Sequence, residues 1–212
     1  MMSTDYIKGT SLKLIQSDQI YKMTSDTYHL ANFIKVRKHD RVLEVGCNHG
    51  VIIMVASLKT DQECLGIDIN QNALELAKKN IEVNEIRNVR FECMDFKQFK
   101  QNNFDLVVCN PPYYKHQNKD DDHAKLDVSL SLEDLAKQAF VVLKDKGRCS
   151  IILAAERMGE AIQIFANQRF ALKRIQMIHH SLHHPASSVC MEFNKLGNIH
   201  CKVEAPILNV EV

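Results

Sequence analysis

The stretch RVLEVGCNHGVIIMVASLK, residues 41–59, decides the fold of this chain because it reads as a strand, a tight turn and a helix. Residues 41–47 contain the aliphatic run typical of a buried strand, and residues 50–59 are apolar enough for a buried helix. Two glycines in the turn, Gly46 and Gly50, would let a ligand approach the backbone closely. The stretch therefore predicts one strand–turn–helix unit of an α/β protein.

The alternation of strand and helix continues beyond this stretch. Further strands are expected at 63–69, 89–95, 104–110 and 148–154, and helices at 70–84, 131–147 and 155–168. Ser131 would cap the second of these helices and Gly147 would end it. Two strand-like segments near 170–178 and 188–194 follow each other without a clear helix, so we expect an antiparallel edge pair. Strands separated by helices imply parallel βαβ units. The prediction is a doubly wound, mostly parallel seven-stranded sheet with helices on both faces. Residues 1–40 would form an N-terminal extension and a helix packed on a single catalytic domain, residues 41–212.

The composition narrows the class of protein. The chain has 212 residues, of which 45% are hydrophobic and 25% charged, as in an ordinary globular domain. No apolar run approaches the roughly 20 residues of a membrane span, and the polar N-terminus carries no readable signal peptide. The seven cysteines form no C-x-x-C pair, which argues against a metal site and indicates reduced thiols. We expect a cytoplasmic protein, and with a net charge of +1 any nucleic-acid binding needs a local basic face.

Ligands of doubly wound sheets bind beyond the carboxyl ends of the strands, so the first turn is a candidate site. Its residues are Glu44, Gly46, Cys47, Asn48 and Gly50, and their spacing does not match the dinucleotide fingerprint Gly-x-Gly-x-x-Gly. Asn tolerates a left-handed backbone better than most residues, so Asn48 is compatible with a tight turn. A turn without any ligand is the alternative interpretation of this stretch on its own.

Acidic residues also follow the second and third strands. Asp68 ends the second strand, where a carboxylate can accept two hydrogen bonds from a ribose diol, each contributing roughly 1.5–3 kcal/mol. The alternative role is a helix cap, which Asn70 already supplies for the following helix. Asp95 ends the third strand, where a turn aspartate is the alternative. Together with Glu44, these residues place acids at three successive strand ends, which favours a nucleotide-like cofactor.

The fourth strand ends in Asn110, Pro111, Pro112 and Tyr113. The lone pair of an amide nitrogen, or of an amine conjugated to a ring, is delocalised, and two acceptors aimed at its N–H bonds would favour a charge-bearing transition state. The Asn110 side-chain oxygen can be one acceptor and a backbone carbonyl held outward by a proline the other. Tyr113 can stack on a planar substrate. The pattern predicts chemistry on a planar nitrogen.

These strand ends resemble those of the class I S-adenosylmethionine-dependent methyltransferases. The first turn resembles their motif I, usually acidic-x-Gly-x-Gly-x-Gly, with Asn48 in place of the middle glycine. The fourth strand end matches the Asn-Pro-Pro-Tyr motif of those that methylate an amino or amide nitrogen. The resemblance implies S-adenosylmethionine as the cofactor and the Pro111 carbonyl as the second acceptor. It also implies that Asp95 accepts from the adenine amino group, with Met94 and Phe96 on either side of the ring.

The implied cofactor-binding set is Asp26, Glu44, Gly46, Cys47, Asn48, Gly50, Asp68, Ile69, Met94, Asp95, Phe96 and Asn110. The implied catalytic set is Asn110, Pro111, Pro112 and Tyr113. No metal is expected.

Segments outside these turns resemble one subgroup, the bacterial tRNA1(Val) adenine-N6 methyltransferases, which modify the adenosine 3′ of the anticodon. YKMTSDTYHLANF, residues 21–33, resembles the Thr/Ser-Asp segment of that subgroup, in which the acidic residue, here Asp26, lies beside the methyl donor. Its plain interpretation is a helix capped by Ser25 or Asp26. HHPASSVCMEFNKLGN, residues 183–198, and the stretch 129–160 are also similar to the subgroup. The resemblance covers nearly the whole chain and implies N6-methylation of a tRNA adenosine in the anticodon loop.

Substrate RNA would need cations and aromatic side chains near the fourth strand end. We expect Tyr113, Tyr114, Lys115 and Lys125 to bind substrate, although the family often has an arginine-rich element where this chain has HAKLDVS. Other candidate RNA contacts are Lys35, Arg37, Lys38, Arg41, Lys173, Arg174, His179, His180, His183 and His184. A solvated surface is the alternative for each of these clusters.

Three other functions share some of these signals. Glutamine-N5 methyltransferases that act on release factors use the same Asn-Pro-Pro-Tyr chemistry, but that family carries a helical N-terminal domain, and only 43 residues precede Glu44 here. Guanine-N2 and DNA-adenine methyltransferases are a second possibility, and the DNA enzymes usually add a recognition domain. A non-catalytic RNA-binding protein on a methyltransferase scaffold is the third, and the intact motif at residues 110–113 argues against it.

Overall fold

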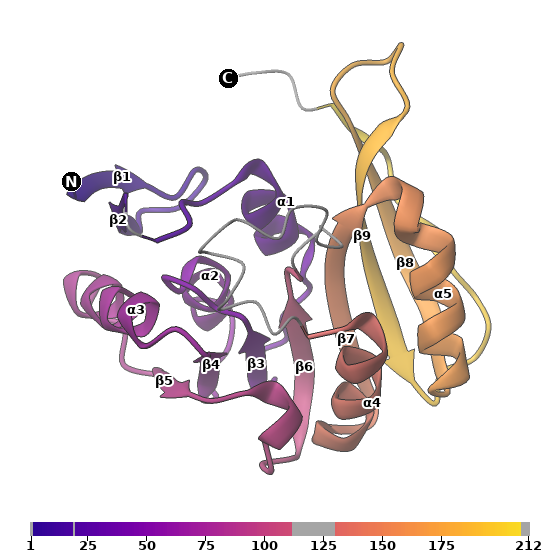
Figure 1. Ribbon diagram of the computed structural model, residues 1–212, viewed down its shortest axis with the longest axis horizontal. Helices are drawn as coiled ribbons and strands as arrows, with labels where there is room; N and C mark the ends of the chain where they lie inside the picture. The colour runs from indigo at the N-terminus through magenta and orange to yellow at the C-terminus, as the bar shows by residue number, and fades with distance from the viewer. Residues whose placement is uncertain (1, 19, 112–129, 209–212) are drawn as a thin grey trace, which may run out of the picture.

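The computed structural model describes residues 2–18, 20–111 and 130–208, and its centre is a nine-stranded sheet with helices on both faces (Figure 1). The sheet strands are β3 (Val42–Val45), β4 (Cys64–Asp68), β5 (Val89–Cys93), β6 (Phe104–Cys109), β7 (Leu143–Ala154), β8 (Phe170–His179), β9 (Ala186–Lys195), β10 (Lys202–Val203) and β11 (Ile207–Leu208). The helices are α1 (Ser25–Phe33), α2 (Val51–Ser57), α3 (Gln71–Val83), α4 (Leu132–Val142) and α5 (Met158–Asn167).

The order and direction of the strands confirm the predicted fold class. The order is β10-β8-β9-β7-β6-β3-β4-β5, and β11 also pairs with β8. Strands β3 to β7 run parallel to one another, whereas β9 is antiparallel to both β7 and β8. All seven predicted strands are present. The two additional strands, β10 and β11, have two residues each, too few for a periodic signal in the sequence.

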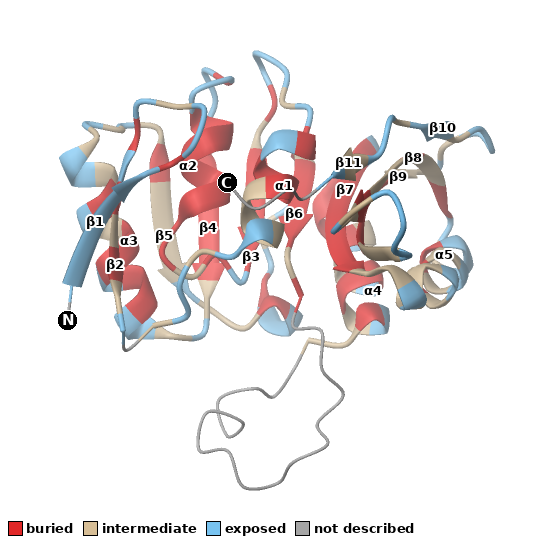
Figure 2. Cartoon of the chain, turned by 90° about the horizontal axis from the view of Figure 1, so that it is seen from above, coloured by how far each residue is buried: buried red, intermediate tan, exposed pale blue. Residues whose placement is uncertain are grey.

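The sheet separates two hydrophobic cores. Along β6, Leu106 and Val108 face the core shared with α1 and α2, while Val107 and Cys109 face the core shared with α4 and α5. Each fully buried aliphatic side chain of this kind contributes roughly 1.5–3 kcal/mol. Figure 2 shows that burial is concentrated in the central strands and in the helices that cover them. Because both faces are covered, these strands appear in the sequence as continuous apolar runs.

The N-terminal extension contains a hairpin that the sequence did not predict. Strand β1 (Met2–Tyr6) pairs antiparallel with β2 (Lys13–Ser17), and β1 is exposed along its length (Figure 2). The helix predicted in residues 21–33 is α1, but its N-cap is Thr24, and the expectation of Ser25 or Asp26 was wrong. Thr24 has an extended backbone and its side chain accepts a hydrogen bond from the backbone N–H of Thr27 at 3.4 Å.

The boundaries of α4 confirm one end of the predicted helix and correct the other. Ser131 caps the helix by accepting from the backbone N–H of Asp134 at 3.0 Å, as predicted. The helix ends at Val142, well before Gly147, because Leu143 is already extended and pairs with Phe104 in the sheet. Burial of the Leu143 side chain in the core therefore outweighs the helical signal of the polar residues that follow.

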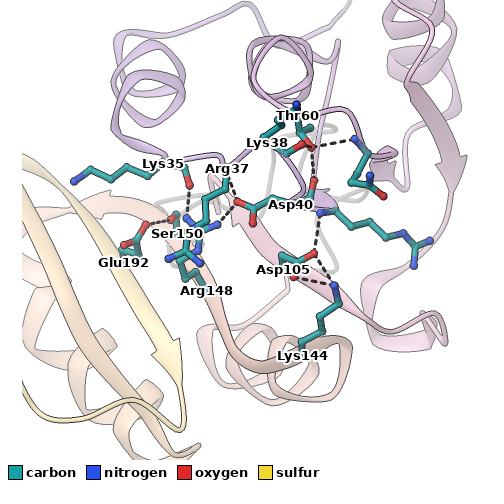
Figure 3. Close-up of polar contacts among 12 residues, drawn as sticks. Lys35, Arg37, Lys38, Asp40, Thr60, Asp105, Lys144, Arg148, Ser150 and Glu192 are labelled. Carbon is teal, nitrogen blue, oxygen red and sulfur yellow. Dashed lines mark hydrogen bonds and ion pairs between the residues drawn. The ribbon is translucent and has the colours of Figure 1, made fainter.

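A buried ion pair joins the segment after α1 to strand β7 (Figure 3). The side chains of Asp40 and Arg148 are 7% and 5% exposed and form a hydrogen-bonded pair. Asp40 also accepts from the backbone N–H of Arg37 at 2.7 Å, and Arg148 donates to the carbonyl oxygen of Lys35. Both charged groups thus have further hydrogen-bond partners, so the geometry of the pair holds the chain between α1 and β3 against the sheet.

Removing one partner of this pair should be strongly destabilising, because the other charge would remain buried without compensation. Asp40→Ala is expected to lower the free energy of unfolding by about 3–5 kcal/mol, measured by urea denaturation. Glu75→Ala is the control, because Glu75 pairs with Lys78 on the surface and such pairs contribute little. A loss for Asp40→Ala no greater than that for Glu75→Ala would contradict the structural role of the buried pair.

Candidate active site

The glycine-rich turn after β3 has three residues in the left-handed region of the backbone. These are Gly46 (φ 68°), Asn48 (φ 49°) and Gly50 (φ 85°), which confirms that Asn48 adopts the conformation expected of it. A Cβ atom on Gly50 would lie 3.0 Å from Phe91 Cζ and 3.4 Å from Ala77 Cβ, so a glycine is needed for packing as well. A Cβ on Gly46 would meet nothing within 4 Å, so open space lies over the first glycine.

Glu44, on β3 just before the turn, is hydrogen-bonded to the start of α2. Its carboxylate is buried and accepts a hydrogen bond from the backbone N–H of Ile53, in the first turn of α2, at 2.7 Å. Burial raises the pKa of Glu44 well above its usual range; the bond from Ile53 opposes this, and the nearby charge of Asp68 adds to it. The backbone N–H groups of Gly46 and Cys47 both donate to the carbonyl oxygen of Ile67 on β4, at 2.9 and 3.0 Å. The side chain of Glu44 thus lies on the protein side of the turn, and direct contact with a cofactor stays a prediction.

Asp68, at the end of β4, joins the turn to the start of α3. One carboxylate oxygen accepts from the backbone N–H of Asn48 at 2.7 Å and the other from the backbone N–H of Asn70 at 2.9 Å. Asn70 caps α3, as the sequence predicted, by accepting from the N–H groups of Asn72 and Ala73. These two bonds fix the orientation of the Asp68 carboxylate at the end of β4, and its contact with a ribose stays a prediction.

The end of β5 lies beside Asp68. The backbone N–H of Met94 donates to the Asp68 carbonyl oxygen at 3.0 Å, and Asp95 caps a short 3-10 turn (Phe96–Gln98) by accepting from Lys97 N–H at 2.9 Å. The ring of Phe96 is buried in the core on the α4 side. Ile69 is half exposed at the end of β4. The adenine contacts of Met94, Asp95 and Phe96 stay predictions.

Helix α1 contacts the fourth strand end through Asn110. The amide nitrogen of Asn110 donates to the hydroxyl oxygen of Thr27 at 3.4 Å. This contact engages the amide nitrogen of Asn110 and leaves its oxygen directed away from Thr27. The sequence did not single out Thr27, although it directly follows Asp26, which did belong to the predicted set.

Two more bonds tie α1 and the segment before it to the same edge of the sheet. Asp26 accepts from the hydroxyl of Ser188 on β9 at 3.1 Å, and Asn48 donates its side-chain amide to the Tyr21 carbonyl oxygen at 2.7 Å. The structure therefore brings Asp26, the glycine turn and Asn110 to one region, and the place of Asp26 beside the methyl donor stays a prediction. Ser188 was not predicted, and its only sequence signal is its place in the stretch 183–198.

The remaining predicted residues are those of the Asn-Pro-Pro-Tyr motif and the segment after it. Pro111 is buried, while Pro112, Tyr113, Tyr114, Lys115 and Lys125 lie outside the described residues. Within the described ranges, no group of His, Cys, Asp and Glu side chains is arranged to hold a metal ion. In the same ranges, no helix is both long and apolar enough to cross a membrane. A surface cavity of about 410 Å³ between the ends of α2 and α3 lies at the amino edge of the sheet and contains none of the predicted site residues.

The comparisons with known proteins agree with this geometry. A family model described as a methyltransferase domain matches residues 36–197. A tRNA1(Val) (adenine(37)-N6)-methyltransferase from Flavobacteriaceae bacterium (strain 3519-10) is 28% identical over 89% of this chain and 84% of that protein. A release factor glutamine methyltransferase from Fusobacterium nucleatum is 31% identical over 63% of this chain and 42% of that protein. The crystal structure of a predicted O-methyltransferase from Agrobacterium tumefaciens superposes with a TM-score of 0.68 at 19% identity, covering 84% of this chain and 85% of that one.

The fold is that of a doubly wound enzyme, and the carboxyl edge of its sheet, with the acidic strand ends, is where such a fold is expected to bind a nucleoside-containing cofactor. The chain belongs to the methyltransferase domain family, because the family model spans about three quarters of its length. It is an S-adenosylmethionine-dependent methyltransferase. The open space over Gly46 and the carboxylate of Asp68 at the neighbouring strand end fit such a cofactor.

The turn also contains a buried histidine that the sequence did not single out. His49 is 3% exposed, neither ring nitrogen has a hydrogen-bond partner among the described residues, and burial lowers its pKa to about 4. Its folded-state pKa lies below the unfolded value near 6.5, so the unfolded chain binds the proton more tightly. Stability from neutral His49 is complete above about pH 6.5 and is lost as the pH falls towards 4.

Wild-type protein should therefore lose about 2 kcal/mol of unfolding free energy from this one group between pH 7 and pH 5. His49→Gln removes the titration and should flatten the pH dependence by that amount, measured by urea denaturation at each pH. Glu44, whose raised pKa favours the folded state at low pH, is unchanged in the comparison and cancels. Identical pH profiles for the two proteins would contradict a buried neutral His49.

Proposed function

We propose that this enzyme transfers a methyl group from S-adenosylmethionine to N6 of an adenosine in tRNA, specifically the adenosine 3′ of the anticodon in tRNA1(Val). The observation that carries the proposal is the contact between the Asn110 amide and Thr27, which leaves the amide oxygen to accept a hydrogen bond. The similarity to the Flavobacteriaceae tRNA1(Val) (adenine(37)-N6)-methyltransferase over most of both chains supports the choice of substrate.

The proposed methyl transfer depends on hydrogen-bond acceptors placed at the two N–H groups of adenine N6. The N6 lone pair of adenine is delocalised into the ring and becomes nucleophilic as the nitrogen pyramidalises. The Asn110 oxygen and the Pro111 carbonyl would accept from its two N–H bonds and stabilise the positive charge that develops. The bound cofactor would supply an electrophilic methyl group. The nitrogen becomes acidic as it is methylated, so the chain needs no strong general base, and catalysis depends mainly on positioning.

The adenosine must leave its stacked position to reach this pocket, as in other enzymes that modify bases. An anticodon loop is single-stranded, so the cost of unstacking one of its bases is lower than in a duplex. In this proposal Tyr113 would stack on the extruded base.

A release factor glutamine is the second candidate substrate, because its amide nitrogen needs the same two acceptors. The 31% identity with the Fusobacterium release factor methyltransferase favours it over a guanine or a DNA adenine. Incubation with a labelled methyl donor and either total tRNA or release factors separates the two. Label in N6-methyladenosine after digestion of the tRNA is the expected result, and label found in protein but not in RNA would exclude the tRNA proposal.

The described basic residues are unevenly placed with respect to the site. Lys35, Arg37, Lys38 and Arg41 precede β3 and therefore lie at the amino edge of the sheet, away from the strand ends that form the site. Arg41 pairs with Glu63 at 3.0 Å, which ties the start of β3 to that of β4. Arg41, one of the four residues predicted from the sequence as an RNA cluster, thus has a contact that serves the fold.

Arg174 also has a structural role. Its guanidinium is buried, lies 3.2 Å from Glu192, and stacks 3.8 Å from the centre of the Phe33 ring. Its burial in these contacts leaves little of the side chain for an external phosphate.

The connection between β8 and β9 is the better candidate for an RNA-contacting surface. Figure 1 shows it rising beyond the ends of the other strands, and it ends close to Ser188, the partner of Asp26. His184 is held within it, since its ring contacts the Ser181 hydroxyl at 2.7 Å and its carbonyl contacts the His179 ring at 3.0 Å. His180 and His183 are exposed, and the sequence has no acidic residue between 179 and 187.

Replacing the proposed acceptor should abolish chemistry without abolishing cofactor binding. Asn110→Ala is expected to lower kcat for tRNA methylation by roughly 10²–10³, the usual cost of losing one such stabilising group. The dissociation constant for S-adenosylmethionine, measured by calorimetry, should change far less than kcat, because the other eleven residues of the implied cofactor-binding set are unchanged. Activity within about twofold of wild type would mean that Asn110 is not an acceptor in the transition state.

The exposed histidines should matter for RNA and not for the cofactor. His180→Ala with His183→Ala is expected to raise KM for tRNA at least about fivefold, because loss of a contact to one base costs roughly 1–3 kcal/mol. The matched control is His39→Ala with His200→Ala, two exposed histidines away from the site edge. Equal KM values for tRNA in the two double variants would exclude a contact between RNA and the β8–β9 connection.

A further inference from the structure

Asn80 on α3 is a fully buried polar residue that does not belong to the predicted site. Its side chain is 0% exposed and makes three hydrogen bonds. The amide oxygen accepts from the backbone N–H of Ile15 at 2.7 Å, and the amide nitrogen donates to the Ile15 carbonyl oxygen at 3.2 Å. The same nitrogen donates to the carbonyl oxygen of His49 at 3.0 Å, inside the glycine-rich turn. One side chain thus contacts both the N-terminal hairpin and the turn.

Asn84, the C-cap residue one helical turn later, makes an equivalent pair of bonds to the hairpin, and its nitrogen also donates to the Asn80 carbonyl oxygen at 2.7 Å. Its amide oxygen accepts from Lys13 N–H at 2.8 Å and its nitrogen donates to the Lys13 carbonyl oxygen at 2.7 Å. The two asparagines lie four residues apart on one face of α3 and pair with alternate residues of β2. The two side chains bond to the backbone of β2 as a neighbouring strand would. Of the two, only Asn80 also bonds to the glycine-rich turn.

The turn needs such external support because its backbone is strained. Asn48 and Gly50 flank His49 with φ values of 49° and 85°, and a non-glycine residue in this region costs roughly 1–2 kcal/mol. Such conformations persist when the surroundings over-determine them. The Asp68 carboxylate, at the end of β4, accepts from the Asn48 N–H. The Asn80 amide, on α3, donates to the carbonyl oxygen of His49.

We propose that Asn80 is a positioning residue for the methyl donor: it fixes the peptide after His49 and makes the geometry of the turn depend on the seated N-terminal hairpin. The inference rests on the proposed cofactor role of the turn at residues 46–50. It assigns the hairpin a part in cofactor binding although the described contacts of β1 and β2 include none with Asp68 or Asn110.

Asn84 is the matched control for Asn80. Both side chains bond to the hairpin, but only Asn80 also bonds to the turn. Full-length wild type, Asn80→Ala and Asn84→Ala would be titrated with S-adenosylmethionine by calorimetry, well below their melting temperatures. Asn80→Ala should weaken cofactor binding about five- to tenfold, as expected for one lost buried hydrogen bond, and Asn84→Ala less than about twofold. In turnover with tRNA, Asn80→Ala should raise KM for the cofactor by the same factor with kcat within about twofold.

A purely structural Asn80 would lower Tm but would not move the cofactor dissociation constant of the folded protein relative to Asn84→Ala. Amide hydrogen exchange gives the second readout: residues 46–50 should exchange faster in Asn80→Ala than in Asn84→Ala. Asn80→Ser, which leaves a smaller cavity with a hydroxyl, serves if the alanine variant does not fold, and the same ordering is expected. Equal dissociation constants and equal exchange for the position-80 and position-84 variants would overturn the proposal.

Asp68→Asn separates this inference from the site on which it rests. If Asp68→Asn leaves cofactor binding unchanged, the turn and its neighbouring strand end are not the cofactor site, and the proposed site fails. If Asp68→Asn weakens binding while Asn80→Ala behaves like Asn84→Ala, the site stands and the positioning role of Asn80 fails.

Discussion

The constraint on which the rest of this structure depends is the left-handed backbone of the turn between β3 and α2. It lets the chain reverse in a few residues, so α2 packs back on the sheet and the backbone of Gly46 faces open space. Gly50 also allows Phe91 and Ala77 to approach within contact distance, which joins the turn to β5 and α3. A bulkier or less permissive residue at position 50 would displace the packing of three elements as well as the proposed cofactor surface.

The N-terminal extension completes the site. Its hairpin is seated on α3 by side-chain amides, its following segment bonds to the turn through Tyr21, and α1 reaches the fourth strand end through Thr27. The partners in the last two contacts are 27 and 83 residues apart in sequence. Because these bonds link distant segments, the proposed site would form only when the extension has docked, and residues before β3 would then have a part in it.

Much of the fold was predictable from sequence because its signals are local. Apolar runs located the seven main strands, and the caps Asn70 and Ser131 located two helix starts. The hairpin β1–β2 has a polar, exposed first strand and no such period. Asn80 and Thr27 are ordinary polar helix residues until tertiary contacts give them partners. The sequence also could not place the basic residues before β3, since closeness to the motif along the chain does not specify which edge of the sheet they occupy.

The N-cap of α1 also influences the orientation of the Asn110 side-chain amide, which is the proposed acceptor. The hydroxyl of Thr27 lies 3.3 Å from that of Thr24, and either can donate. A threonine hydroxyl has one proton and two lone pairs. When Thr27 gives its proton to Thr24, it can only accept from Asn110, so the amide nitrogen turns toward α1 and the oxygen toward the opposite side. A helix cap would then select which end of Asn110 meets the substrate, and an incoming amine would find an acceptor already oriented.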